Sequence, residues 1–145
     1  MKKLEGFAIV TGSSRGLGRE MVLRCAADGH DVVVNYTSDK SKDAAEAVAA
    51  EAREKYGRRA LVIKADVSKY DECKAMMAQA SEYFGERLAI LVANAGIKNL
   101  LDFDELSHED YERVINVNLM GVMHAVHCAI PYMKDGKGGS IIMLS

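Results

Sequence analysis

Five short apolar runs alternate with longer segments of helical periodicity along this chain. The runs cover Phe7–Val10, Asp31–Tyr36, Ala60–Ile63, Leu88–Val92 and Ile141–Leu144. Each is short, nearly continuous in its apolar character and rich in branched side chains, which is typical of strands buried on both faces of a parallel sheet. The pattern therefore predicts five parallel strands.

The segments between these strands are predicted to be helices. The first has apolar residues on one face, the second is rich in Ala, Glu and Lys, and three of them end at or next to a glycine. The four predicted helices cover Gly16–Ala27, Ser38–Tyr56, Ser68–Gly85 and Ser107–Met133. Ser68-Lys69-Tyr70-Asp71 and Ser107-His108-Glu109-Asp110 are capping-box patterns at the starts of the last two. Pro131 is expected to kink or shorten the final helix.

Strands that alternate with helices predict an α/β fold, a Rossmann-like doubly wound parallel sheet of strand order 3-2-1-4-5. A length of 145 residues, with 49% hydrophobic and 28% charged residues, fits one domain over residues 1–145. The net charge of −2 gives no reason to expect nucleic acid or a membrane as a partner. Three scattered cysteines and no leader pattern predict a cytoplasmic protein.

A glycine-rich turn joins the first predicted strand to the first predicted helix. It reads Thr11-Gly12-Ser13-Ser14-Arg15-Gly16-Leu17-Gly18. Small residues let a pyrophosphate approach the backbone, where free N–H groups and the positive helix end bind anions. The spacing is neither Gly-x-Gly-x-x-Gly nor a Walker loop, and a tight turn without a ligand is the alternative. The position in the sheet favours dinucleotide binding through Gly12, Ser14, Arg15, Gly16, Leu17 and Gly18.

The end of the second strand indicates which dinucleotide is bound. A site for NAD carries an acid there, about 20 residues past the glycines, which binds the ribose hydroxyls. Here Asn35 and Tyr36, both expected at the cofactor, are followed by no acid before Asp39. Arg15, unless it is simply a solvated turn residue, can pair with a 2′-phosphate. The combination favours NADP(H) over NAD(H).

Three further segments, taken with the turn, resemble the short-chain dehydrogenase/reductase family. Asp66-Val67 follows the third strand, Asn94-Ala95-Gly96 follows the fourth, and Asn116-Val117-Asn118-Leu119 lies in the long helix. The segments span the whole chain in the family's order. The likeness is greatest to the 3-oxoacyl-[acyl-carrier-protein] reductase branch, which implies an NADPH-dependent oxidoreductase of fatty acid biosynthesis.

The resemblance implies a role for each segment. Asp66 would accept a hydrogen bond from the adenine amino group, and Val67 would contact the adenine through its backbone. Asn94, Ala95 and Gly96 would line the cofactor ribose. Asn118 would be the active-site asparagine, at a helix bend where a backbone carbonyl holds a water of the proton relay. The implied reaction is hydride transfer between the nicotinamide and a carbonyl, such as that of a 3-oxoacyl-carrier protein.

The family's other catalytic groups are a serine past the fifth strand and a later Tyr-x-x-x-Lys pair. Ser145 is only a weak candidate for that serine, and the pairs Tyr36–Lys40 and Tyr70–Lys74 are expected to lie far from the nicotinamide. The chain therefore resembles a truncated N-terminal portion that lacks the family's last strands and helices and is inactive alone. A non-catalytic nucleotide-binding module is the alternative, and a methyltransferase is disfavoured because it usually needs an acid after the second strand.

Two further features of the sequence bear on metal binding and on self-association. His124, His127 and Cys128 have helical spacing, but no further ligand is visible, so packing is favoured and no metal is expected. The fifth strand and the long helix would leave apolar surface open in a shortened fold. We therefore expect self-association into a homo-oligomer.

Overall fold

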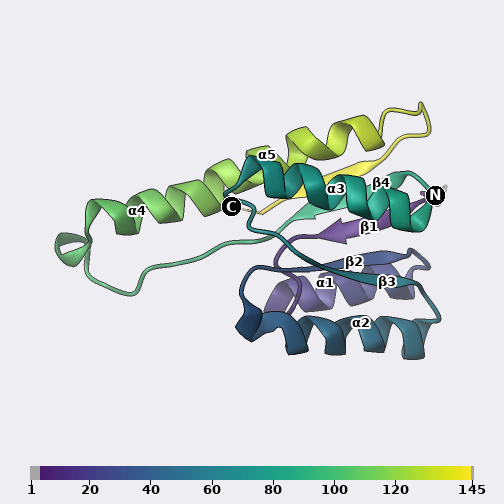
Figure 1. The fold of residues 1–145 in the computed structure, drawn as a ribbon, viewed down its shortest axis with the longest axis horizontal. Helices are drawn as coiled ribbons and strands as arrows, with labels where there is room; N and C mark the ends of the chain where they lie inside the picture. The colour runs from purple at the N-terminus through teal and green to yellow at the C-terminus, as the bar shows by residue number, and fades with distance from the viewer. Residues whose placement is uncertain (1–3, 145) are drawn as a thin grey trace.

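The computed structural model describes residues 4–144, in which a five-stranded sheet has helices on both faces (Figure 1). Neighbouring strands are parallel and their order is β3-β2-β1-β4-β5, so the predicted doubly wound topology is confirmed. The strands are β1 (Phe7–Val10), β2 (Val32–Tyr36), β3 (Ala60–Lys64), β4 (Leu88–Ala93) and β5 (Ser140–Met143). The predicted candidate Ser145 lies outside the described residues.

Alternate side chains of the central strands supply two separate cores. Phe7 and Ile9 of β1 pack beneath α3 (Tyr70–Phe84) and α5 (Gly121–Ala129), whereas the neighbouring Ala8 and Val10 pack against α1 and α2. α1 spans Gly16–Ala27, and α2 spans Lys42–Tyr56 after a short 3₁₀ turn, η1, at Asp39–Ser41. Because both faces of β1 and β2 are covered, these strands are buried along their whole length.

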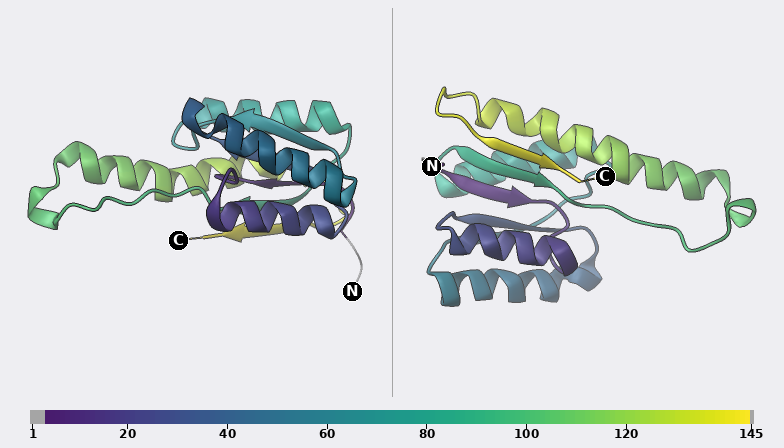
Figure 2. Two further views of the ribbon diagram at one scale, coloured as in Figure 1. Left: turned by 90° about the horizontal axis from the view of Figure 1, so that it is seen from below. Right: turned by 180° about the vertical axis from the view of Figure 1, so that it is seen from behind.

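The last helical segment is one continuous helix of four parts. They are α4 (His108–Ile115), the π-helical η3 (Asn116–Met120), α5, and the 3₁₀ turn η4 (Ile130–Tyr132). α4 extends away from the sheet like an arm, and none of its residues is buried (Figure 2). Pro131 lies in η4, where the helix ends one residue before the predicted end. By length and composition alone this helix could cross a membrane, a test that core helices of soluble proteins also pass.

One of the two predicted capping boxes is confirmed. Ser107 Oγ accepts a hydrogen bond from Asp110 N at 3.2 Å, and Asp110 Oδ2 accepts one from Ser107 N at 2.9 Å. The box at Ser68 is wrong, because α3 begins one residue later and its N-cap, Lys69, has no side-chain cap. Ser68 Oγ instead donates to Asp66 Oδ1 at 2.7 Å, so the hydroxyl belongs to the loop before the helix.

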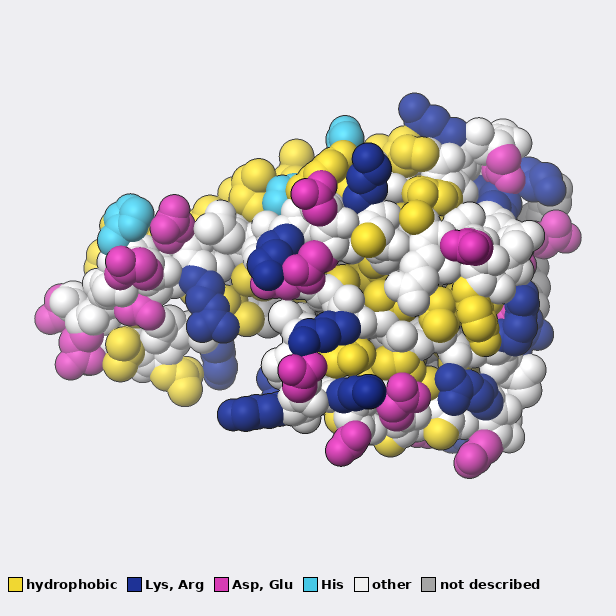
Figure 3. All heavy atoms as spheres, in the orientation of Figure 1, with side chains coloured by type: hydrophobic (Ala, Val, Ile, Leu, Met, Phe, Trp, Pro, Cys, Tyr) yellow, Lys and Arg dark blue, Asp and Glu magenta, His cyan; other side chains and the backbone are white. Residues whose placement is uncertain are grey.

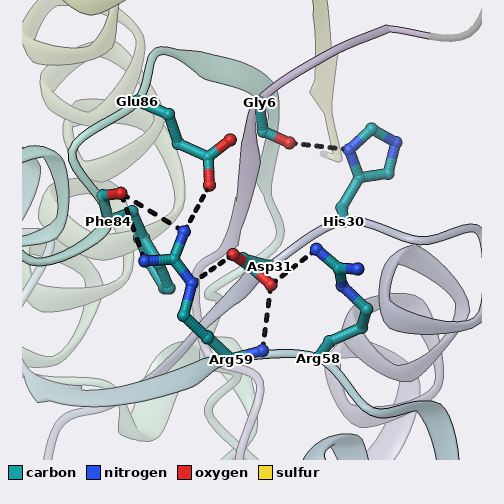
Figure 4. A network of polar contacts seen from close by, with 7 residues as sticks. All are labelled: Gly6, His30, Asp31, Arg58, Arg59, Phe84 and Glu86. Carbon is teal, nitrogen blue, oxygen red and sulfur yellow. Dashed lines mark hydrogen bonds and ion pairs between the residues drawn. The ribbon is translucent and has the colours of Figure 1, made fainter.

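A charged network ties together the amino-terminal edge of the sheet (Figure 4). Asp31, just before β2, is 3% exposed and contacts Arg58 Nη2 at 2.8 Å and Arg59 Nε at 2.6 Å. The Arg59 guanidinium also donates to the carbonyl of Phe84 at 3.2 Å and to Glu86 at 2.7 Å. The network therefore joins β2, β3, α3 and β4 at the edge opposite the glycine-rich turn.

Candidate functional site

A cleft of about 690 Å³ lies at the carboxyl ends of the strands, where the molecule is hollowed between the α4 arm and the body (Figure 3). Ligands of doubly wound sheets bind at this edge, beside the point where the strand order reverses. The predicted cofactor residues that line it are Gly12, Ser14, Arg15, Gly16, Leu17, Gly18, Tyr36, Asp66, Val67, Asn94, Ala95 and Gly96. The fold thus brings together every predicted cofactor residue except Asn35, whose position is described below.

The glycines of the turn are required by close packing and by backbone conformation. A Cβ on Gly12 would lie 2.9 Å from Ala95 Cα, and one on Gly18 would collide with the Gly12 carbonyl oxygen and lie 2.6 Å from Asn94 Nδ2. Gly16 has open space around it but a φ of +57°, which disfavours other residues. The turn is therefore pressed against the segment after β4, and its backbone faces the cleft.

Asn35, also predicted to bind the cofactor, lies behind the turn and does not line the cleft. Its side chain is fully buried, and its Oδ1 accepts a hydrogen bond from Gly12 N at 2.9 Å. Its Nδ2 donates to the carbonyls of Ile63 at 3.3 Å and Ala65 at 3.2 Å. Asn35 therefore fixes the turn to the end of β3, which is an indirect role.

Thr11 and Asn94 join the ends of β1 and β4 beneath the cleft. Thr11 Oγ1 accepts hydrogen bonds from the backbone N–H groups of Asn94 and Ala95, both at 3.0 Å. In return, Asn94 Nδ2 donates to the carbonyls of Thr11 at 2.9 Å and Gly12 at 3.2 Å. This reciprocal pairing uses the Asn94 side chain for structure and leaves the backbone of the segment at the cleft.

No carboxylate from the end of β2 reaches the cleft. Tyr36 lines it, but Asp39, the first acid after the strand, pairs with Lys64 Nζ at 2.7 Å outside the lining. The hydrogen bond and charge of Lys64 lower the pKa of Asp39, so the carboxylate stays ionised. Arg15 lines the cleft with an exposed side chain, and within residues 4–144 its guanidinium makes no hydrogen bond or ion pair. The one cation of the turn is thus available to a ligand.

The amino-terminal end of α1 also faces this cleft. Its N-cap, Arg15, provides no side-chain cap for the N–H groups of the first turn. Uncapped N–H groups at a helix start attract anions, and the helix dipole reinforces the attraction. A phosphate group in the cleft would meet these donors.

Asp66 occupies the opposite wall with a fixed orientation. Its Oδ1 accepts from Ser68 N at 3.0 Å and from Ser68 Oγ at 2.7 Å, while Asp66 N donates to Glu72 Oε2 at 2.7 Å. That backbone hydrogen bond, aided by Lys69, lowers the pKa of Glu72. The loop after β3 is thereby anchored to the first turn of α3.

Asn118, the predicted active-site asparagine, lies in η3, the π-helical turn of the long helix. Its Oδ1 accepts from Ile97 N and its Nδ2 donates to the Ile97 carbonyl, both at 2.8 Å. Its neighbours Asn116 and Val117 line the main cleft, whereas Asn118 lines a second, more apolar hollow of about 500 Å³. Ile97 lines both spaces, so its hydrogen-bonded partner Asn118 lies beside the boundary between them.

Sequence reasoning missed a whole wall of the cleft. Residues that follow β2 (Thr37, Ser38 and Ser41), Ile97 of the loop after β4, Glu109, Glu112 and Arg113 of α4, and Asn116 at the start of η3 also line it. The helical periodicity of residues 107–133 predicts a helix but not the direction in which its first part projects. The charged residues of that part predict an exposed helix face, and their pattern does not indicate that they line a cleft.

The rejected Tyr-x-x-x-Lys pairs and the two helical histidines have other contacts. Tyr70 lies outside the cleft lining, and its Oη is 3.1 Å from His127 Nδ1. His124 Nδ1 is 3.0 Å from the carbonyl oxygen of Val67. Tyr36 lines the cleft but Lys40 does not. In the part of the chain that the structure describes, no three His, Cys, Asp or Glu side chains gather at one point.

Comparison with known proteins agrees with this geometry. The chain is 41% identical over 146 residues to an uncharacterised oxidoreductase of Methylorubrum extorquens, covering 100% of this chain and 56% of that protein. It is 40% identical over 143 residues to the 3-oxoacyl-[acyl-carrier-protein] reductase FabG of Staphylococcus aureus, covering 99% of this chain and 56% of the reductase. The chain thus spans about half the length of these relatives.

A solved structure and a family model extend the comparison. A short chain dehydrogenase from Burkholderia cenocepacia, in complex with NADP, superposes with a TM-score of 0.85 at 39% identity, covering 94% of this chain and 53% of that one. Residues 6–145 match the family model described as short chain dehydrogenase. The chain belongs to the short chain dehydrogenase family of oxidoreductases.

Proposed function

We propose that this chain binds NADP(H) in the cleft and is the cofactor-binding portion of a reductase that acts on a carbonyl. The proposal rests on the charged groups near the end of β2, where a cation lines the cleft and no carboxylate from that strand end does. Arg15 is unpaired there among the described residues, and the first acid, Asp39, is held by Lys64 outside the lining. A 2′-phosphate fits a free guanidinium, whereas the ribose hydroxyls of NAD would lack their usual carboxylate.

Each wall of the cleft has a distinct part in holding the cofactor. The uncapped start of α1 and the glycine-rich turn suit the pyrophosphate, because both present free N–H groups. Asp66 and Val67 suit the adenine, and the backbone of Asn94-Ala95-Gly96 suits a ribose. The bound cofactor supplies hydride chemistry, and the chain's own residues bind it and orient it.

The proposed substrate is a ketone, of which a 3-oxoacyl group on a carrier protein is the leading candidate because of the similarity to FabG. Reduction adds a hydride to the carbonyl carbon and a proton to its oxygen. The two Tyr-x-x-x-Lys pairs within these 145 residues begin at Tyr36 and Tyr70. Neither has its tyrosine and lysine together at the cleft, so we propose that residues 1–145 bind the cofactor without turnover.

A non-catalytic nucleotide-binding module is the second candidate, and it shares the same cleft. The two are distinguished by a longer polypeptide that carries this segment followed by a Tyr-x-x-x-Lys pair. Turnover of NADPH with a 3-oxoacyl thioester by that polypeptide supports the reductase. Tight NADPH binding without turnover supports the module.

Titration of the 145-residue chain with NADPH and with NADH, followed by nicotinamide fluorescence, tests the binding proposal. A charge-assisted contact to the 2′-phosphate should favour NADPH by about tenfold or more. Failure to bind either dinucleotide overturns the proposal. Measurable NADPH oxidation by this chain with a ketone overturns the proposed inactivity.

We also propose a cytoplasmic location, with neither nucleic acid nor membrane as a partner. Cys25, Cys73 and Cys128 are free thiols in the structure, which suits a reducing compartment. The α5 part of the helix from His108 to Tyr132 packs on the body, where Gly121, Ala125, Cys128 and Ala129 are buried. Cell fractionation with an antibody to the chain tests this location.

A further inference from the structure

We propose that His124 is a positioning residue, which holds Val67 in the wall of the cleft and so sets the affinity for the adenosine part of the cofactor. The inference rests on the proposed function of the cleft. It concerns a residue that does not line the cleft itself and that acts through the Val67 backbone.

The contact between the two residues has a defined direction. His124 lies half-buried on α5, and its Nδ1 is 3.0 Å from the carbonyl oxygen of Val67. A carbonyl oxygen can only accept, so Nδ1 carries the hydrogen and donates it. Val67 belongs to the loop between β3 and α3, and its neighbours Asp66 and Ser68 also line the cleft. A side chain of α5 is thereby connected to the adenine wall.

The same carbonyl oxygen is held from α3 as well. Cys73 Sγ donates to it at 3.5 Å. Burial, together with the neighbouring Cys128, raises the pKa of Cys73 to about 12, so the thiol remains protonated and a donor. A thiol is a weak donor, so the imidazole of His124 supplies most of the restraint on this carbonyl.

Gly121, one helical turn before His124, lets the backbone of α5 pack directly against the Val67 side chain. A Cβ at Gly121 would lie 2.6 Å from Val67 Cγ2 and 3.1 Å from Val67 Cβ. The Val67 side chain is 3% exposed, so it cannot retreat from α5 without opening the core. Gly121 and His124 therefore seat Val67 together, by contact and by hydrogen bond.

The imidazole is itself held in place. The Tyr70 ring meets the His124 ring edge-on, with centroids 5.6 Å apart. His127 lies on the same helix and touches the same tyrosine, but among residues 4–144 it has no hydrogen bond to Val67. It is the matched control for His124.

The test measures 2′,5′-ADP binding to the 145-residue chain by calorimetry, because this ligand carries the adenosine and the 2′-phosphate without the nicotinamide. His124→Leu should weaken binding about two- to tenfold, the range expected for one lost hydrogen bond. His124→Asn, whose Nδ2 is bonded to Cγ as Nδ1 is in histidine, should restore most of the affinity. His127→Leu should bind like wild type. Gly121→Ala should weaken binding by displacing Val67.

Thermal unfolding of the free proteins is measured beside each titration. Equal affinities for wild type and His124→Leu would overturn the inference, as would a His124→Asn protein that binds no better than His124→Leu. Should the leucine variant fail to fold, His124→Asn must match wild type and Gly121→Ala must bind more weakly, or the inference fails. A wild-type chain that does not bind 2′,5′-ADP at all contradicts the proposed function, which separates the two failures.

Discussion

The side-chain oxygen of Asn35 accepts the backbone N–H of Gly12 at 2.9 Å, which joins a fully buried residue of β2 to the first glycine of the cofactor turn. The other end of the amide donates to carbonyls at the end of β3. One side chain thus ties together the ends of three strands beneath the cleft. Both amide groups are needed, since one end faces a donor and the other faces acceptors.

Asn35→Asp should destabilise the protein and weaken NADPH binding. The new carboxylate keeps the acceptor for Gly12 but turns its second oxygen toward the carbonyls of Ile63 and Ala65, where no hydrogen bond can form. We expect a loss of about 2–3 kcal/mol in the free energy of unfolding, measured by urea denaturation. Gln79→Glu, the same amide-to-carboxylate change on the exposed face of α3, is the control. Equal stability of the Asn35 variant and wild type would contradict this role.

Gly18→Ala and Gly16→Ala should differ in severity. Alanine is favoured over glycine inside a helix by about 1 kcal/mol, so propensity alone predicts that Gly18→Ala stabilises α1. The collision with the Gly12 carbonyl and the 2.6 Å approach to Asn94 Nδ2 outweigh this gain. Gly16→Ala meets no atom and carries only the strain of its positive φ, about 1 kcal/mol.

Urea denaturation and NADPH titration of both glycine variants check this order. Gly18→Ala is expected to lose the greater part of its cofactor affinity and to be the less stable of the two. A more stable Gly18→Ala protein with unchanged affinity would show that the turn is not packed as described.

Asp31 should make the protein less stable in acid. Burial opposes its ionisation, but hydrogen bonds from the Arg59 backbone and side chain and the charges of Arg58 and Arg59 outweigh burial and lower its pKa. A carboxyl with a lowered pKa stabilises the fold above its ordinary value of 3.8, and this contribution is lost as pH falls from there toward the folded-state pKa. Glu86, the other acid on Arg59, has its pKa raised by burial and by Asp31.

Unfolding free energies of wild type and Asp31→Asn, measured from about pH 7 down to about pH 2 so that the range extends below the ordinary carboxyl pKa, test this assignment. At neutral pH the variant should be less stable by about 2 kcal/mol, because both arginines lose their buried partner. Its stability should also change less than that of wild type as the pH falls. Asp39→Asn, which removes an exposed ion pair with Lys64, should stay close to wild type throughout. Parallel pH curves for wild type and Asp31→Asn would refute the assignment.

We propose that the chain self-associates through its long helix. Tyr111, Ile115 and Leu119 follow each other at helical spacing and are 44%, 51% and 54% exposed. Hydrophobic side chains gather along the upper edge of the molecule, over the part of the long helix that contains α5 (Figure 3). Ile115→Glu should shift the protein toward monomer in analytical ultracentrifugation, whereas Glu82→Lys on α3 should not. A wild-type monomer at all concentrations would contradict the proposal.

The strand order and the place of the cleft could be predicted from the sequence because burial leaves a strong pattern. A continuous apolar run such as Phe7–Val10 predicts a central parallel strand. The glycine-rich turn after that run predicts that the ligand binds at the carboxyl ends of the strands. The position of Asp66 and Asn94 at that edge follows from their places just after strands.

The remaining features depend on contacts between distant segments. Asn35 is a polar residue in an apolar strand, which indicates that its side chain forms buried hydrogen bonds. Its partners, Gly12 and Ala65, belong to other elements, so the local sequence does not reveal them. Ser68 matches a capping box, yet Asp66 takes its hydroxyl. No local pattern shows that α4 forms a wall of the cleft.

The central claim is that Arg15 selects NADP(H) in this cleft, and the affinity ratio of NADPH to NADH tests it most directly. The ratio is measured for wild type, Arg15→Ala and the control Arg24→Ala, whose arginine pairs with Asp28 at the far end of α1. We predict that Arg15→Ala weakens NADPH binding about tenfold and leaves NADH binding nearly unchanged, while Arg24→Ala keeps the wild-type ratio. An unchanged ratio in Arg15→Ala would contradict the account.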